Sequence, residues 1–454
     1  MSTNNRLEQR LEEAYEQLID NLIDPRDAWY DDDGLRWMPV GMSSDSRHTI
    51  GAAYRTEPEL ADIQAQCRAL AVSNEFAING HENRISYIVG TGHNYRAALK
   101  KHAAASPQLA IAVQQLLDAF LRNNQWHRRQ QETLLRMDRD GEAILRLFVD
   151  HEGSTRVRFV EPGQLVTPQE LAGQQAHSFG VHTDADDVET VHGYWIDGTY
   201  IDAGEVQHRK ANVDQNVKRG LPLFFPVRKN LRRAERLLRN MSIVAEIQSA
   251  IALIRRHRSG SRSAVQQFIS QQADATVTSP ASSRTSHVKR YGPGTILDAH
   301  ADVDYEFPAA ALDAGSYVTV LQAELRAIAA RLVMPEFMLT SDASNANYSS
   351  TMVAEGPAVR MFERAQRQMI DGDLEILRRV VDHAVHRGQL PIDVLTQIEI
   401  QAVPPSLNVR NRLEESQAWR IEFESGVLSR QTWSQRCGLD YDQEQENMAE
   451  ERRE

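Results

Sequence analysis

The chain has 454 residues, of which 41% are hydrophobic and 25% charged, so it is long enough for roughly three ordinary globular domains. Its formal net charge of −12 argues against a protein whose whole surface grips nucleic acid, because such proteins carry excess Lys and Arg to neutralise phosphates. The two cysteines, Cys67 and Cys437, form no CxxC motif, which argues against a disulfide framework or zinc site, and we expect both to be buried in a protein of a reducing compartment.

The N-terminal part of the chain is predicted to be a peripheral arm. Residues 6–22 have an amphipathic helical pattern, and 31–34 form an acidic turn. The first 21 residues lack the apolar core of a signal peptide, and no run reaches the roughly 18 apolar residues of a membrane span. We therefore expect a protein that starts and stays in the cytoplasm. A helix is then predicted over 57–79 and a strand over 85–89.

Another helix is predicted over 107–137, and the pattern changes after the turn signal at 138–141. From there, alternating apolar and polar residues predict short strands at near-regular spacing. Such strands favour an antiparallel sheet packed on the preceding helices, which makes an α+β unit. The predicted strands are 143–149, 155–160, 177–182, 188–196 and 200–207.

A long helix is predicted from Pro226 to His257, with apolar residues at helical spacing on its buried face. It would end in Arg255, Arg256 and Arg258. Cations at that position complement the negative end of a helix, so helix capping and the binding of an anionic partner both remain open. More cations crowd the first turns of this helix: Arg228, Lys229, Arg232, Arg233, Arg236 and Arg239.

Residues 259–314 are poor in large apolar side chains and rich in Ser, Thr, Ala and Gly. The local patterns there are a short helix at 265–271 and strands at 287–291 and 303–307. A segment of this kind buries little core alone. It is therefore either a flexible excursion or, as we favour, an element that gains order from neighbouring copies of the chain.

The stretch 315–387 predicts a helix, a polar loop and a much longer helix. Pro335 stops the first helix, and Ser341–Asn347 is a run of small, turn-favouring polar residues. The helical pattern resumes near Ser350 and continues for about 35 residues, or roughly 50 Å. Gly356-Pro357 either starts this helix or kinks it. By itself, the stretch fits two core helices of a bundle joined by a surface loop.

The C-terminal part combines one strand with three helices. The strand is predicted over 395–403 and the first helix over 410–424, with Gly426 after it. Ser429 is placed to cap a second helix, and Asp440 begins a final charged one.

Motifs for common catalytic chemistry are missing from the sequence. It contains no GxxxxGK[ST], HExxH or GxSxG pattern, which argues against a P-loop motor, a zinc protease and a serine hydrolase. A metal-dependent enzyme acting on nucleic acid remains an alternative, as does a helical scaffold or adaptor without a DNA function. The carboxylates that could bind metal, or simply be solvated in turns, are Asp184, Asp186, Asp187, Asp298, Asp302, Asp304 and Glu306.

Several short stretches between about 74 and 450 occur in a distinctive order and spacing. They are Asp140-Gly141-Glu142, Val160-Glu161-Pro162, Lys218-Arg219-Gly220-Leu221-Pro222, Asn347-Tyr348-Ser349-Ser350, Gly426-Val427-Leu428-Ser429 and Gly438-Leu439-Asp440. In this arrangement the chain resembles the portal proteins of tailed bacteriophages, of the lambda type. The N-terminal arm and residues 258–314 lie outside the resemblance.

The resemblance implies a homo-oligomeric ring, commonly of twelve subunits, at one vertex of a phage capsid. Double-stranded DNA would pass through its central channel during packaging and ejection. It implies no enzymatic activity and no cofactor. The implied partners are further copies of the chain, DNA, the terminase large subunit, a head–tail adaptor and the major capsid or scaffold protein, without a membrane. The protein would occupy the virion vertex, and the host cytoplasm during assembly.

The resemblance also implies an α+β portal fold with a wing, a two-helix stem, a small clip, a long kinked helix and a helical crown. In this chain these parts would be the N-terminal arm 1–56, wing 57–220, stem helix 221–258, clip 259–314, second stem helix 315–334, tunnel loop 335–350, long helix with a return to the wing 351–409, and crown 410–454.

Two groups of site residues follow from the resemblance. A basic cluster where the stem meets the clip would contact DNA phosphate or an acidic partner: Arg255, Arg256, Arg258 and Arg262. Acidic residues facing a channel would repel phosphate over a Debye length of roughly 8 Å, so that DNA slides. The tunnel loop would bring small residues close to the DNA at the narrowest point of the channel: Ser341, Asp342, Ala343, Ser344, Asn345, Ala346, Asn347 and Ser349.

Overall fold

The chain divides into two units, Met1–Ala52 and Ala53–Glu454, and the first lies wholly outside the residues that the structure describes. The predicted helix at 6–22 therefore lies outside the described residues. The predicted elements at 265–271 and 303–307 lie outside them as well. The computed structural model describes residues 53–452, except 101–105, 152, 257–274, 279–284, 289–294, 300–313, 343–347, 406, 408–411 and 438–440.

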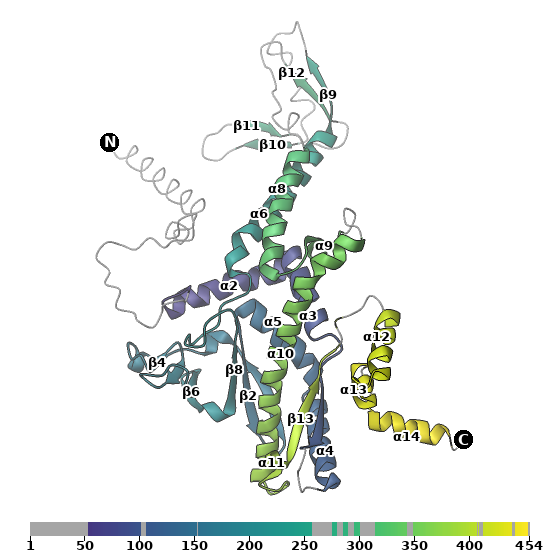
Figure 1. The fold of residues 1–454 in the computed structure, drawn as a ribbon. Coiled ribbons are helices and arrows are strands. Elements are labelled where there is room, and N and C mark those ends of the chain that lie inside the picture. The colour runs from purple at the N-terminus through teal and green to yellow at the C-terminus, as the bar shows by residue number, and fades with distance from the viewer. Residues whose placement is uncertain are drawn as a thin grey trace. The chain divides into compact units, whose positions relative to one another are not determined.

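Helices make up most of the described chain, and Figure 1 shows the long helix α10 running past α3, α5 and β13. The helices are α2 (Glu57–Ser73), α3 (Glu75–Ile88), α4 (Pro107–Asn123), α5 (Trp126–Asp140), α6 (Arg228–Ala250), α8 (Ala314–Leu332), α9 (Glu336–Thr340), α10 (Tyr348–His386), α11 (Val394–Gln397), α12 (Arg412–Glu424), α13 (Arg430–Arg436) and α14 (Tyr441–Glu451).

The strands form small sheets, and nearly all pairings among the described residues are antiparallel. The larger sheets have the orders β3-β2-β8 and β4-β5-β6-β7, and the two-stranded ones are β1-β13, β10-β11 and the parallel pair β12-β9. The strands are β1 (Asn94–Leu99), β2 (Glu142–Val149), β3 (Thr155–Val160), β4 (His177–Ser178), β5 (Val181–Thr183), β6 (Val191–Ile196), β7 (Thr199–Asp202), β8 (Val206–Lys210), β9 (Ile251–Arg256), β10 (Ala275–Thr278), β11 (Thr285–Val288), β12 (Thr295–Ala299) and β13 (Ile398–Val403).

Two apolar cores hold these elements together. The larger core joins α2, α3, α4 and α5 to the inner side of β2 and to α8 and α10, with Leu117, Ile328 and Leu377 fully buried. The smaller core lies between the two larger sheets and includes Ile144, from β2, and Tyr194, from β6. The described chain is thus a mixed helix-and-strand fold, as the sequence predicts.

The helix predicted over 57–79 is interrupted at Asn74. The backbone of Asn74 is extended, and its side chain accepts hydrogen bonds from the backbone N–H groups of Phe76 and Ala77, so it ends α2 and caps α3. The strand predicted over 85–89 was wrong, because Ile85–Ile88 form the last turn of α3 and Val89 is the residue after it. A short apolar run fits either structure, and packing decides between them.

The helix predicted over 107–137 is likewise two helices. Gln125 adopts a left-handed backbone (φ 48°) between α4 and α5. Asn124 stabilises this break, because its side chain donates to the carbonyl of Thr155 and accepts from the backbone N–H of Val157 on β3, each within 3.0 Å. The break therefore depends on a partner distant in sequence.

The predicted strands at 143–149 and 155–160 are confirmed as β2 and β3. The strand predicted over 177–182 is a hairpin, β4–β5, because Phe179 and Gly180 both have positive φ. The strand predicted over 200–207 is split by a turn after Asp202, whose side chain accepts from the N–H of Gly204. The strand predicted from residue 188 begins only at Val191.

The helix predicted to reach His257 ends at Ala250. Residues Ile251–Arg256 instead form β9, which pairs in parallel with β12. Ile and Leu in this run suit a strand as well as a helix, and a strand partner satisfies the backbone. Helix α8 agrees with its prediction, but Pro335 precedes the short helix α9 instead of starting a loop.

Near the C-terminus, the first part of the strand predicted over 395–403 is the short helix α11, and only β13 is extended. The prediction that both cysteines are buried was half wrong: Cys67 is buried in the core, whereas Cys437 is exposed after α13. Ser429 caps α13 as predicted, because its hydroxyl accepts from the N–H of Thr432 at 3.1 Å.

Candidate functional site

The predicted loop near DNA lies between α9 and α10. Ser341 has a left-handed backbone (φ 57°) directly after α9, and the exposed Asp342 follows it. Residues 343–347 lie outside the described residues. The prediction that Ser349 belongs to this loop was wrong, because α10 begins at Tyr348 and includes it.

Helix α9 holds the start of this loop in place. The side-chain amide of Asn79 on α3 donates to the carbonyl oxygens of Met338 (3.0 Å) and Leu339 (2.7 Å), and Asn83 donates to the carbonyl of Met338 at 2.8 Å. The side chain of Leu339 is 1% exposed. These bonds bind the last carbonyls of a short helix that could not persist alone. The loop therefore leaves from a fixed position.

A buried carboxylate fixes α10 at its middle. The Oδ2 of Asp373 accepts hydrogen bonds from Tyr95 on β1 (2.5 Å) and Gln130 on α5 (2.7 Å), and its Oδ1 pairs with Arg209 on β8 at 2.7 Å. Burial and the charge of Asp373 raise the pKa of Tyr95 far above the ordinary tyrosine value. Gly372 leaves room for this ion pair, since a Cβ there would lie 2.7 Å from Cζ of Arg209.

Two of the motifs that carry the family resemblance meet in space. A Cβ at Gly220 would lie 1.8 Å from the carbonyl oxygen of Gly141, so only glycine allows this approach. Next to it, the guanidinium of Arg219 pairs with the fully buried Glu142, Nε at 2.9 Å from both carboxylate oxygens. The resemblance supplied these motifs separately, and no local pattern predicts that they touch.

Glu142 is also bonded by His208, whose Nε2 lies 2.9 Å from Oε2. Burial by itself would raise the pKa of Glu142, but Arg219 and His208 outweigh it and hold that pKa well below the ordinary value. Tyr54 joins this cluster by donating to the carbonyl of Arg219. The cluster ties the start of the described chain, β2, β8 and the loop before α6 to one another.

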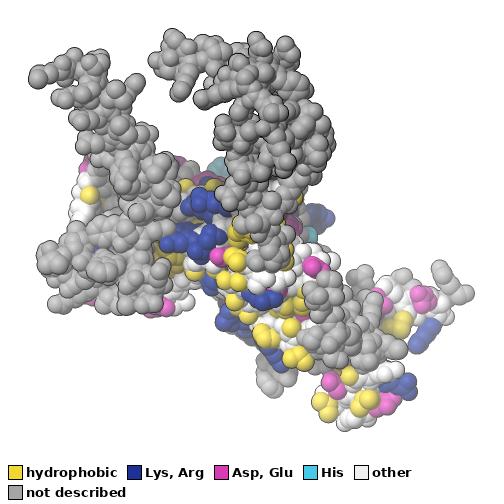
Figure 2. All heavy atoms as spheres, turned by 90° about the horizontal axis from the view of Figure 1, so that it is seen from above, with side chains coloured by type: hydrophobic (Ala, Val, Ile, Leu, Met, Phe, Trp, Pro, Cys, Tyr) yellow, Lys and Arg dark blue, Asp and Glu magenta, His cyan; other side chains and the backbone are white. Residues whose placement is uncertain are grey.

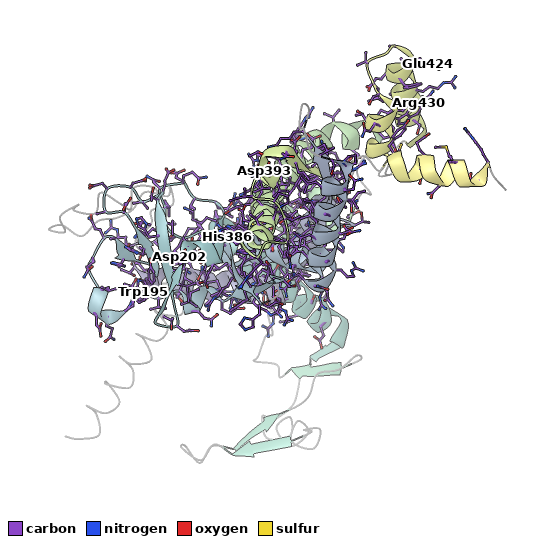
Figure 3. The ribbon with its side chains drawn as sticks, turned by 90° about the horizontal axis from the view of Figure 1, so that it is seen from below. Trp195, Asp202, His386, Asp393, Glu424 and Arg430 are labelled. Carbon is purple, nitrogen blue, oxygen red and sulfur yellow. The ribbon has the colours of Figure 1, made fainter. Side chains whose placement is uncertain are left out.

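The four-stranded sheet carries a partly exposed aromatic cluster. The rings of His177 and His182 stack with centroids 4.1 Å apart, and Nδ1 of His182 lies 2.9 Å from the hydroxyl of Tyr200. Trp195, labelled on this sheet in Figure 3, packs edge-on against Tyr200. Burial, together with the neighbouring histidines, lowers the pKa of His182. No motif in the sequence marks these histidines as ligands, and the strand pairing of the sheet brings them together.

The carboxylates that could have bound metal are not gathered into a site within the described chain. Asp184 pairs with His192 at 2.8 Å, Asp187 accepts from Thr190, and Asp298 lies on β12. No group of three or more His, Cys, Asp or Glu among the described residues has the arrangement of a metal site. No described helix is both long and apolar enough to cross a membrane. Asp302, Asp304 and Glu306 lie outside the described residues.

The predicted basic cluster is only partly described. Arg255 and Arg256 lie on β9, where they pair in register with Asp298 and Ala299 of β12. Arg258 and Arg262 lie outside the described residues. The capping interpretation was wrong, because α6 ends at Ala250 and these cations are not in its last turn.

One family model matches most of the chain. The family model described as phage portal protein, lambda family, matches residues 41–366. A chain of the virion of a native gene transfer agent particle has 14% identity and a TM-score of 0.45, covering 85% of this chain and 94% of that one. A chain from the neck of that particle, computed with C12 symmetry, has 14% identity and a TM-score of 0.41, covering 86% and 97%. No curated protein matches the chain.

A third structure, the crystal structure of an HK97-family phage portal protein from Corynebacterium diphtheriae, has 12% identity and a TM-score of 0.31. The match covers 74% of this chain and 94% of that one.

Proposed function

Because this chain belongs to the lambda family of phage portal proteins, we propose that twelve copies form a closed ring at one capsid vertex, around a channel for double-stranded DNA. The observation that carries the proposal is the family match over residues 41–366, which spans both larger sheets, α6, α8 and the loop before α10. The ring would assemble in the host cytoplasm and remain in the virion. It would serve as a conduit and docking platform without catalysis.

The packing of α6 and α8 supports a ring. The two helices lie side by side (Figure 1), and each leaves large apolar side chains in solvent: Ile243 is 43% exposed, Val318 41% and Val320 51%. Val318 and Val320 lie about 200° apart around α8, so the exposed apolar side chains face different directions, as contact with a neighbour on each side would require. Subunits standing side by side in a ring would cover them with their own neighbours.

The small sheets between α6 and α8 support the same arrangement. As described, β10-β11 and β12-β9 each contain two strands, so each keeps unpaired edges. Such edges are aggregation sites unless another strand or element covers them, and an isolated two-stranded sheet is marginal. Neighbouring subunits in a closed ring would complete them.

The parts of the ring are proposed as follows. Residues 57–220 would form the wing, α6 and α8 the stem, and the segment between them the clip on which the terminase docks. Helix α10 would cross the wing, and α12 to α14 would form the crown. The first stem helix would thus stop at Ala250, and the clip would begin there with β9.

The loop after α9 would line the channel. Its start is held by Asn79 and Asn83, which supports a loop that would enter the channel at a defined height. Asp342 is the charged residue of the run 341–347 and is exposed. A ring of such carboxylates would repel phosphate and let DNA slide.

A loop variant in the phage that encodes this chain tests the function. Deleting residues 343–347 should leave rings intact but reduce the amount of packaged DNA, measured as nuclease-protected DNA per capsid. The Ile392→Ala variant is the control, because Ile392 is 92% exposed in the turn after α10. Normal packaging by the loop deletion would show that the loop does not act on DNA.

A further inference from the structure

The first turns of α6 carry a basic face, defined by Lys229, Arg232, Arg233, Arg236 and Arg239. Steps of three and four residues place these side chains on one side of the helix, over a length of about 15 Å at 1.5 Å per residue. All but Arg232 are classed as exposed, and Arg232 is half-buried. Figure 2 shows Lys and Arg side chains gathered near the middle of the face seen from above.

The basic face is only partly neutralised by the chain itself. Arg233 pairs with Glu324 on α8 at 3.1 Å, and Asn230 donates to the same carboxylate at 2.7 Å. Within the described part of the chain, no carboxylate lies at ion-pair distance from Arg232, Arg236 or Arg239. The face therefore presents positive charge on a protein whose formal net charge is −12.

Helix α8 lies between α6, which carries the basic face, and α9, after which the loop begins. Glu324 contacts α6, whereas Arg326 pairs with Glu336 on α9 at 2.7 Å. Two residues along a helix correspond to a rotation of about 200°, so α6 and α9 lie on opposite sides of α8. Leu231 and Ala234, both fully buried, face the core on the side of α6 away from the arginines. Arg232, Arg236 and Arg239 thus lie on the side of α6 away from the core, and α8 lies between α6 and α9, after which the loop begins.

We propose that the basic face of α6 docks an acidic segment of the protein shell that surrounds the ring at the capsid vertex. The inference rests on the ring proposed above. If the loop faces the channel, the basic face lies on the outer circumference of the stem. There it meets shell protein, while the DNA in the channel is on the far side of α8. Repeated around the ring, the face forms a positive belt that a carboxylate-rich segment complements.

The test is incorporation of the ring into shells. The chain is co-expressed with the shell protein of its own phage, and the ratio of portal to shell protein in purified shells is measured. We expect the R232E/R236E/R239E variant to form rings, seen by electron microscopy, while its incorporation falls at least tenfold. The R232K/R236K/R239K variant, which keeps the charge, should incorporate within about threefold of wild type, since rim charges act mainly through their sign.

A second charge-reversed variant controls for charge reversal away from the basic face. Arg360 and Arg367 are exposed on α10 and already paired with Glu363 and Asp371, so R360E/R367E should incorporate normally. If the triple glutamate variant does not form rings, the single variant R236E carries the test. Normal incorporation of charge-reversed rings would overturn the inference. If the shells containing those rings also failed to package DNA, the basic face would be assigned to DNA instead. A wild-type chain that forms no rings would instead refute the proposed function.

Discussion

Substitution of Gly372 by alanine tests how α10 is fixed in the fold. In a helix interior, Gly→Ala ordinarily stabilises by roughly 1 kcal/mol. Here the new Cβ would lie 2.7 Å from Cζ and Nε of Arg209. That guanidinium cannot move away freely, because it is buried and bonded to Asp373 and Gln207, each at 2.7 Å.

The balance favours destabilisation. Overpacking a buried site costs about 1–3 kcal/mol, and weakening one hydrogen bond to a charged group costs about 1.5–3 kcal/mol. The weakened hydrogen bond alone costs more than the gain of roughly 1 kcal/mol in helix propensity, and the difference is about 0.5–2 kcal/mol. We therefore expect Gly372→Ala to lower the free energy of unfolding by about 0.5–2 kcal/mol, in spite of the better helix former.

Gly356 supplies the matched control in the same helix, because a Cβ there meets nothing within 4 Å. Gly356→Ala should be neutral or stabilise by up to about 1 kcal/mol, less what crowding by the following Pro357 removes. Urea unfolding of both variants, followed by circular dichroism, gives the comparison. A Gly372→Ala midpoint at or above that of wild type would refute the idea that the Arg209–Asp373 pair fixes α10.

Three further predictions concern charge, the loop anchor and the channel. The folded-state pKa of Glu142 is depressed, so its contribution to the free energy of unfolding is full above the unfolded pKa of roughly 4.3 and is lost as the pH falls towards the folded value. The free energy of unfolding of Glu142→Gln should therefore fall less steeply than that of wild type between pH 5 and 3. Asn79→Ala should destabilise by about 1–3 kcal/mol and speed amide exchange at 336–342, and unchanged exchange would rule out the anchor. Asp342→Lys should slow DNA translocation by adding a phosphate contact, and an unchanged packaging rate would show that the loop does not reach DNA.

Local patterns in the sequence predicted the elements whose structure depends on neighbours along the chain. The alternation in β3 and the apolar stripe of α8 were sufficient because one face of each is buried, and β2, which is buried on both faces, was recognised by its apolar run. Gly426 and Ser429 were predicted correctly because a positive φ and a side-chain cap are local properties.

The predictions failed where a distant partner determined the structure. The break at Asn124 requires the carbonyl of Thr155, and the strand β9 requires β12, so a helical pattern continued past both in the sequence. The buried ion pairs were beyond prediction for the same reason, since Arg209 and Asp373 are separated by 164 residues. The loop at 341–347 was recognisable by its small polar residues, but α9 was missed because its stability comes from α3.

The most direct test of the account is the oligomeric state of the purified full-length protein. Negative-stain electron microscopy together with mass photometry should show rings with a central channel and a mass near twelve times that of one 51.3 kDa chain. Because the apolar side chains on α6 and α8 would lie between subunits, rings of the wild-type protein should persist at lower protein concentration than rings of the Val320→Glu variant. A species that remains a monomer at high concentration would contradict the ring and, with it, the channel.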